Sequence, residues 1–278
     1  MSEIKHIPTP QNFIYPEIKP EDFKFGSGQL SAEVVKKVPD WREYLPAEEI
    51  QRRNGIESSS CYVGALQNAY ETVQEEKYGI IDGNYSERFN TILSDGTTVG
   101  GSPLKGAQSI RDDGMIPESL LPFDDEIMSW DEYHSFKGAS ETLCRLRGKE
   151  WRKKWNPEYE IVFSKNDPLE IKYSRIAERL KSSPLAVSVT AWYEKDGLYI
   201  KPEGMADGHL ALATHLDPQG KVTIFDTYPP YIKILEPWFD FDFGMSVGIK
   251  AIPTTTLPNE TAVDIINLII NWFKKLFK

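Results

Sequence analysis

The character of the sequence changes at Pro184, and this change limits the fold more than any other feature. Before Pro184, apolar or small residues recur at helical spacing, most clearly over 61–77. After it, LAVSVTAW, HLALATHL and KVTIFDTY are alternating or β-branched runs separated by Gly, Asp and Pro, and they predict antiparallel strands. A helical half followed by a strand half predicts an α+β fold of two packed subdomains.

The first part of the chain contains four segments with helical spacing or composition. The first, 61–77, follows three serines that can cap its free N–H groups, and it ends just before Gly79. A second helix is predicted at 103–112. The charged and aromatic stretch 125–160 is predicted to be helical and partly exposed, and 173–181 to form another short helix.

The composition is acidic, with 42 Asp and Glu residues against 32 Lys and Arg in 278 residues and a net charge of −10. This charge disfavours nucleic acid as a partner, because such binding needs clustered Lys and Arg. The sequence has no apolar run long enough to span a membrane, and its first residues lack the apolar segment of a secretory signal. These features argue against an integral membrane protein and against secretion.

Only two cysteines, Cys61 and Cys144, occur in the sequence. Two cysteines cannot form a disulfide framework, and no Cys or His pair has the spacing of a zinc site. We expect Cys144 to be a structural thiol, and we expect neither a metal nor another cofactor.

The two ends of the chain differ in composition from its centre. Residues 1–38 are rich in Pro, Lys and Glu, and we interpret them as an arm that wraps a surface or stays mobile. Residues 39–252 form the predicted folded domain, and 253–262 is a Pro- and Thr-rich linker. Residues 263–278 are predicted to form an amphipathic helix with a wide apolar face. That face needs cover by the protein's own body, by another subunit of a homo-oligomer, or by a membrane surface.

Three residues far apart in the sequence carry reactive chemistry. Cys61 stands at the predicted start of a helix, where the helix dipole and free N–H groups stabilise a thiolate. His209 begins one strand segment and Asp226 ends the next, so adjacent antiparallel strands can bring the two side chains together. His215 is a competing base, but it lies at the far end of its strand, where we expect a surface histidine.

The order of these residues resembles the papain family of cysteine peptidases over about residues 38–252. The 148 residues between Cys61 and His209 agree with the roughly 130–150 of papain-like chains. The segments that carry the resemblance are DWREYLP, SSSCYVGALQNA, YSER, VGGSPLKGAQSIRDDGMIPESLLPF, SPLAVSV, DGHLALATHL and KVTIFDTYPP. The resemblance implies a papain-like fold with a helical half and an antiparallel β half.

The resemblance also implies catalytic roles. Cys61 is then the nucleophile, His209 the acid and base, and Asp226 the residue that orients His209. The Cys61 N–H is then one oxyanion donor, and a side-chain amide upstream is the other.

Two residues compete as that amide. Gln51 has the residue type of the family but lies ten positions before Cys61. Asn54 fits the spacing better but has a shorter side chain. We favour Gln51, with an insertion at 52–57.

The sequence departs from the family pattern at several places. Asp226 stands where the family usually has Asn, although a carboxylate can also accept the imidazole N–H. Tyr62 and Tyr228 replace tryptophans, the second of which shields this hydrogen bond in the family. Ser58 stands where a half-cystine is expected, and about forty residues precede the domain, fewer than in the family's inhibitory prosegment. We therefore expect a reducing site of action and control of activity by other means.

The resemblance further implies the substrate contacts. The backbone of Gly100 and Gly101 then pairs with an extended peptide by strand addition. The positions that match the main specificity pocket are Ser102, Pro103, Ser188 and Leu210. Their small to apolar character predicts an aliphatic or aromatic side chain two residues before the cut.

These features predict a cysteine endopeptidase of intracellular, bacterial or viral type that acts on peptide or protein substrates. A catalytically idle papain-like fold with a structural or binding role is the first alternative, favoured by Asp226 and by the open choice of oxyanion residue. A cell-wall peptide amidase is the second, disfavoured by the Gly-Gly segment and the long helical half. The predicted location is cytoplasmic, with membrane-surface or particle association through 263–278 as a further option.

Overall fold

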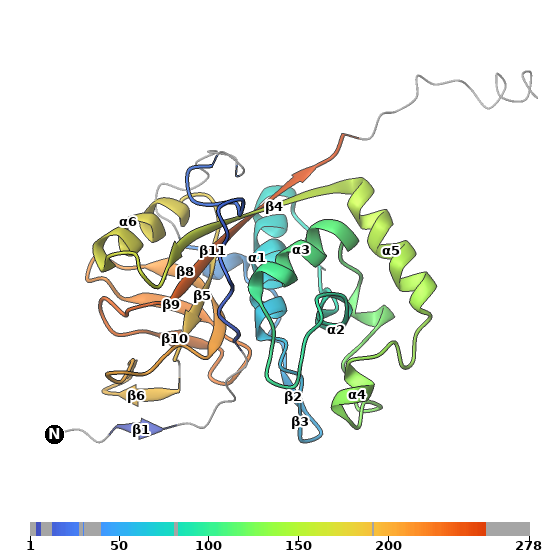
Figure 1. Ribbon diagram of the computed structural model, residues 1–278, viewed down its shortest axis with the longest axis horizontal. Helices are drawn as coiled ribbons and strands as arrows, with labels where there is room; N and C mark the ends of the chain where they lie inside the picture. Colours follow the sequence, from blue (N-terminus) through green and yellow to red (C-terminus); the bar gives the residue numbers. More distant parts are fainter. Residues whose placement is uncertain are drawn as a thin grey trace, which may run out of the picture.

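Helix α1, Cys61–Tyr78, lies at the centre of the molecule, between a helical half and a sheet half (Figure 1). Every residue from Cys61 to Gln74 is buried, as expected of a helix that belongs to the core on all its faces. Gly79, in the left-handed conformation, ends it. This computed structural model describes residues 4–6, 13–27, 30, 40–80, 83–190 and 192–253.

The helical half lies beside α1, to the right in Figure 1. It contains α2 Glu87–Leu93, α3 Pro103–Asp113, α4 Trp130–Tyr133, α5 Glu141–Lys154 and the 3-10 turn η2 Glu118–Leu120; another turn, η1 Arg42–Tyr44, precedes α1. Serine side chains cap α2, α4 and α5. The prediction of serine capping is wrong for α1, because Ser60 Oγ lies 2.7 Å from Ser58 Oγ instead.

The other half is a six-stranded antiparallel sheet in the order β10-β9-β8-β5-β11-β4. Its strands are β4 Trp155–Ser164, β5 Leu185–Val189, β8 His209–Leu216, β9 Val222–Phe225, β10 Ile232–Ile234 and β11 Phe243–Ala251, and α6 Leu169–Arg179 lies next to β4. A small sheet joins β1 Lys5–His6, β6 Tyr193–Lys195 and β7 Leu198–Tyr199, and β2 Arg52–Arg53 pairs with β3 Ile56–Glu57.

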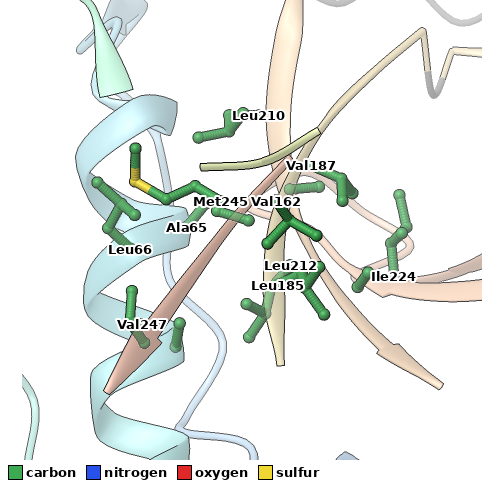
Figure 2. Packing of buried hydrophobic residues seen from close by; sticks show 14 of the residues in the cluster. Ala65, Leu66, Val162, Leu185, Val187, Leu210, Leu212, Ile224, Met245 and Val247 are labelled. Atoms are coloured by element: carbon green, nitrogen blue, oxygen red, sulfur yellow. The ribbon is translucent and has the colours of Figure 1, made fainter. Parts of the chain in front are cut away.

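The main hydrophobic core fills the space between α1 and the sheet (Figure 2). Ala65 and Leu66 of α1 lie beside Met245 and Val247 of β11. Burial of each large side chain of this kind contributes about 1.5–3 kcal/mol. The core therefore fixes the start of α1 relative to the strands, and with it the position of Cys61.

The predicted α+β fold, with a helical half and an antiparallel half, is confirmed, but the helical interpretation of 125–160 is wrong at its end. Residues from Trp155 onward belong to β4, which pairs with β11 along its length. β4 is an edge strand, where Pro157 and outward polar residues are tolerated, and these residues hide the strand pattern. The helix predicted at 173–181 is α6, which begins earlier, at Leu169.

Two described parts of the 1–38 arm pair with strands of the sheet half. Lys5–His6 pairs with β6, and Phe23 and Phe25 form backbone hydrogen bonds with Ile161 of β4. The predicted tail helix 263–278 and the predicted linker from residue 254 onward lie outside the described residues. None of the described helices combines the length and apolar composition that a membrane span requires.

Candidate active site

Two neighbouring strands bring His209 and Asp226 together. His209 is the first residue of β8, and Asp226 follows Phe225, the last residue of β9. Because β8 and β9 are antiparallel neighbours, these two ends meet at one edge of the sheet. Nε2 of His209 lies 2.6 Å from Oδ1 of Asp226, and both side chains are buried. One ring nitrogen of His209 is therefore held by a carboxylate.

The second ring nitrogen of His209, Nδ1, is buried and left for Cys61. Among the described side chains, no nitrogen or oxygen atom forms a hydrogen bond with Nδ1. Cys61 interacts with the imidazole both electrostatically and through a hydrogen bond. Since Cys61 is the first residue of α1, the positive end of the helix dipole also acts on its sulfur.

The charges around His209 and Asp226 reinforce one another. Burial disfavours the protonated imidazole, but the negative charges of Asp226 and Cys61 outweigh it and raise the pKa of His209 from 6.5 to about 10. Burial acts against the ionised Asp226 as well, yet His209 and Lys233 lower the pKa of its carboxyl from 3.8 to about 2. At neutral pH the site therefore holds a protonated His209 beside an ionised Asp226, with Cys61 next to the imidazolium.

An inserted β-hairpin, residues 52–57, brings Gln51 close to the start of α1. Its turn, Asn54–Gly55, has positive φ angles of 52° and 76°, as the two-residue hairpin turn requires. Ser58 N–H donates to the Gln51 carbonyl over 3.1 Å and closes the open end. Asn54 lies at the exposed tip, where its side chain donates to a backbone carbonyl of the helical half. The hairpin thus holds Gln51 near α1 and Asn54 away from it.

Gln51 is buried, and both ends of its side-chain amide are held. Its Oε1 accepts from the Thr227 hydroxyl over 2.7 Å, and its Nε2 donates to Glu57 Oε1 over 2.8 Å. Thr227 follows Asp226, and its methyl group faces Gly64 in the first turn of α1. Because an amide nitrogen carries two N–H groups, one remains after Glu57 has accepted the other.

Tyr228 covers His209 from the side of the hairpin. The two ring centroids lie 5.4 Å apart, with an interplanar angle of 59°. The Tyr228 hydroxyl donates to Glu57 Oε2 over 2.6 Å, and burial together with Glu57 raises the pKa of Tyr228 well above its ordinary value. Glu57 therefore connects the ring over His209 to the amide of Gln51.

Gly101 approaches Tyr62 so closely that a larger residue does not fit. A Cβ atom on Gly101 would lie 2.3 Å from the Tyr62 ring. Gly100 has a φ of 98°, which favours glycine. The two glycines lead directly into α3, for which Ser102 is the N-cap residue and Pro103 the first helical residue. Contact with α1 thus fixes the backbone that is expected to pair with a substrate.

The N-terminal arm lies across this same backbone. Ile14 N–H donates to the Gly101 carbonyl over 3.2 Å, and Phe13 forms a parallel bridge with Gly101. Phe13 N–H donates over 3.0 Å to the carbonyl of Gly208, which precedes His209. The arm therefore already occupies an acceptor that an extended peptide would use by strand addition.

Aromatic side chains of the arm pack next to the expected specificity pocket. Phe13 and Tyr15 contact the ring of Phe243, with centroid separations of 6.0 and 6.2 Å. Ser188 is fully buried; it accepts from Phe243 N–H and donates to a buried carboxylate. Leu210 is also buried and lies in the core (Figure 2). The roles of Ser188 and Leu210 in a pocket stay predictions.

Lys233 contacts Asp226 Oδ2, and no pattern in the sequence predicts this contact. The sequence IKI of β10 predicts a lysine that faces solvent between two inward isoleucines. The structure has the opposite arrangement, with the lysine inside. The sequence likewise carries no pattern that points to Glu57 and Thr227, the two partners of the Gln51 amide.

Other predicted side chains lie apart from these groups. Cys144 is buried among Phe89, Ile116 and Leu121, as expected of a structural thiol. His215 lies beyond an irregularity in the pairing of β8 with β9 and is partly exposed. In the part of the chain that the structure describes, no group of three or more His, Cys, Asp or Glu side chains is arranged to hold a metal ion.

Solved cysteine proteases share this arrangement of elements. Xylellain, a cysteine protease from Xylella fastidiosa, is 16% identical, with a TM-score of 0.60 over 88% of this chain and 99% of its own. Bromelain from Ananas comosus is 16% identical, with a TM-score of 0.52 over 75% and 96%. Digestive procathepsin L 3 of Tenebrio molitor is 15% identical, with a TM-score of 0.54 over 82% and 73%.

Sequence comparison adds nothing to these structural matches. No protein-family model matches the chain, and no curated protein matches it. At identities of this size the similarity shows the fold alone, and the chain has the papain-like peptidase fold.

Proposed function

We propose that this chain, which has the papain-like fold, is a cysteine endopeptidase that hydrolyses peptide bonds through Cys61, His209 and Asp226. The observation that carries the proposal is the position of His209. One of its nitrogens is held by Asp226 and the other is left for Cys61 at the start of α1. A nucleophile, a base and a residue that orients the base are the parts that acyl transfer needs.

These positions support the following reaction. The Cys61 thiolate attacks the peptide carbonyl, and the protonated His209 gives its proton to the leaving amine. A thioester acyl-enzyme results, and water that His209 activates hydrolyses it. Asp226 holds the imidazole in the orientation that both steps require.

Two donors serve the oxyanion that forms during the attack. The first is the backbone N–H of Cys61, and the second is the free N–H of the Gln51 amide. The burial of Gln51 and its contacts with Thr227 and Glu57 support this role, because a fixed donor needs no reorganisation during the reaction. Asn54, exposed at the hairpin tip, lacks this support.

The substrate is a peptide or an unfolded protein segment in extended form. The arm supports this proposal, because it pairs with Gly101 by a backbone hydrogen bond in the manner expected of such a substrate. Ser102 and Pro103 lie next to this backbone and line the proposed pocket together with Ser188 and Leu210.

The experiment that tests the function is covalent labelling of Cys61. E64 is the inhibitor in the bromelain structure, and we expect it to label this chain as well. Because the arm covers Gly101, the Ile14→Pro chain, which loses the N–H donor, is labelled in parallel. We expect labelling of both chains and none of Cys61→Ala. If neither chain is labelled at Cys61, the peptidase proposal is wrong and the idle papain-like fold is favoured.

The substrate class needs a second measurement. Denatured protein and purified cell wall are incubated separately with a chain that E64 labels at Cys61. Cys61→Ala is the control. Release of peptides from denatured protein alone supports an endopeptidase. Release from cell wall alone favours the peptide amidase.

The proposed partners and location rest on residues 263–278 of the sequence. Liposome co-sedimentation and light scattering of the full chain and of a chain lacking 258–278 test a membrane-surface contact and a homo-oligomer. We expect the shortened chain to keep its activity on small peptides, because Cys61, His209 and Asp226 all precede the deletion. We also propose a cytoplasmic location.

A further inference from the structure

Strand β10 is inverted relative to the usual alternation of a strand. Ile232 and Ile234 are 45% and 43% exposed, whereas Lys233 between them is 3% exposed. Burial of an ammonium group is unfavourable unless an opposite charge and hydrogen bonds compensate for it. The inward lysine therefore depends on a partner inside the sheet half.

That partner is Asp226. Nζ of Lys233 contacts Oδ2 of the carboxylate, while Nε2 of His209 lies 2.6 Å from Oδ1. Nζ also donates to the Tyr228 carbonyl over 2.7 Å and lies 5.6 Å from the ring centroid of Tyr199. Each oxygen of the carboxylate thus has its own cationic neighbour.

The contact explains physically why this chain can have Asp226 where the papain family usually has a neutral Asn. An Asn presents the imidazole with an acceptor oxygen and no net charge. A lone buried Asp226 would present a full negative charge to His209. With Lys233 on the opposite oxygen, the pair again presents an acceptor oxygen and a net charge of zero.

We propose that Lys233 is a positioning residue of the site, which fixes Asp226 and cancels its net charge so that the pair acts on His209 as an uncharged acceptor. The proposal rests on the proposed peptidase function. Without Lys233, Asp226 holds the protonated imidazole too strongly, and His209 becomes a weaker acid toward the leaving amine. Without Asp226, Lys233 opposes protonation of His209.

A structural role for the same lysine predicts different behaviour. β10 is an edge strand, and inward charges on edge strands prevent pairing with other chains. In that role Lys233 affects association and stability, but it does not affect the titration of His209. The pH dependence of the site therefore separates the two roles.

Charged or titratable groups reach His209 from several elements. Cys61 faces it from α1, Asp226 from the end of β9, and Lys233 acts from β10 through Asp226. Tyr228 covers the ring from the following loop, and Glu57 of the hairpin binds the Tyr228 hydroxyl. Variants at Asp226 and Lys233 leave Cys61, Tyr228 and Glu57 unchanged.

The test compares four full-length proteins: the unsubstituted chain, Lys233→Met, Asp226→Asn and the double variant. The rate of Cys61 alkylation by iodoacetamide and the kcat/KM for a peptide substrate are each measured against pH. The pH at which His209 loses its proton is the alkaline limit of kcat/KM and a second step in the alkylation rate. We expect this pH to be highest in Lys233→Met, followed by the unsubstituted chain, the double variant and Asp226→Asn. Lys233→Met and the unsubstituted chain, which differ by one charge beside His209, should differ by about 1–3 pH units, the usual effect of one neighbouring charge.

The activities should follow a matching pattern. We expect Asp226→Asn to lose about 100-fold in kcat/KM, within the range of acid–base catalysis. The double variant should regain at least about tenfold of this loss, because it no longer carries an uncompensated buried lysine. Lys195→Met, the same substitution at an exposed lysine of β6, is the control and should change neither profile.

Two results would overturn the proposal about Lys233 alone. One is an alkaline limit that Lys233→Met leaves unchanged, and another is a double variant no more active than Asp226→Asn. If thermal unfolding shows that Asp226→Asn does not fold, the order of the other three proteins still decides. If peptides are not cleaved but Cys61 is alkylated, the alkylation profile decides about Lys233 while the peptidase function fails. Absence of Cys61 alkylation in the unsubstituted chain overturns both.

Discussion

The two sides of the site are stabilised by different kinds of interaction. On the side of α1, Gln51 is held by hydrogen bonds with Thr227 and Glu57, and Gly101 by close packing against Tyr62. On the side of the sheet, His209 is held by buried charges. The first side should therefore respond to changes of size and of hydrogen-bond donors, and the second to changes of charge and pH.

Gln51 gives the largest expected effect on the α1 side. Gln51→Ala removes the proposed second oxyanion donor, so we expect kcat to fall by about 10²–10³-fold, with KM changed little. Steady-state kinetics on a peptide substrate measure this. Asn54→Gly, at the hairpin tip, is the matched control, because glycine tolerates its positive φ. Equal losses in both variants would show that the hairpin, and not the Gln51 amide, supports activity.

Gly101 tests the role of packing on the same side. Gly101→Ala places a Cβ 2.3 Å from the Tyr62 ring, and overpacking of this kind costs about 1–3 kcal/mol in unfolding free energy. Denaturant unfolding measures the loss. The control is Gly83→Ala, where the new Cβ meets its nearest neighbour at 3.5 Å. A double variant with Tyr62→Leu should recover part of the stability, and a failure to do so would place the strain elsewhere.

His209 tests the role of charge on the sheet side. Its pKa in the folded chain is about 10, above the ordinary 6.5, so its protonation stabilises the fold fully below 6.5. This contribution is lost as the pH rises from 6.5 through about 10. We expect the unfolding free energy to fall over this range by at least about 1.4 kcal/mol, the value of one pKa unit. His209→Gln should lack this fall, and equal pH slopes in both chains would contradict the charge argument.

The arm gives the smallest expected effect, because it contacts both sides through single hydrogen bonds. Ile14→Pro removes the N–H that donates to Gly101. A net hydrogen bond is worth about 1 kcal/mol, so we expect kcat/KM to rise about fivefold. Ile14→Ala keeps the N–H and is the matched control. A similar rise in both variants would assign the effect to the side chain instead.

Sequence patterns predicted the elements that periodicity and turn residues define. The helices from Cys61 and from Pro103, and the strands around His209 and Ala186, carry clear spacing over several residues. β4 was missed because Asn156, Glu158 and Glu160 interrupt its apolar pattern, and its pairing with β11 makes it a strand. Edge strands are therefore the elements that local pattern describes least well.

The candidate site shows the same division. Cys61, His209 and Asp226 are located by order and by their places at element ends, which the sequence displays. Lys233 and Glu57 are not, because their roles depend on which face of a short strand turns inward. In β10 the two isoleucines face outward and the lysine inward, against the expectation that apolar side chains are buried. The buried carboxylate of Asp226 explains this arrangement.

The hydrogen bonds of Ile14 to Gly101 and of Phe13 to Gly208 should persist when the protein is diluted. Because the arm is part of the same chain, it competes with substrate at an effective concentration that does not depend on the amount of protein in solution. Its hold on Gly101 is therefore the same in a dilute and in a concentrated solution of the protein. A separate peptide with the sequence of residues 13–16 would act only when added at a comparable concentration. The local supply of substrate, and not the amount of the protein, should then decide how often the site is open.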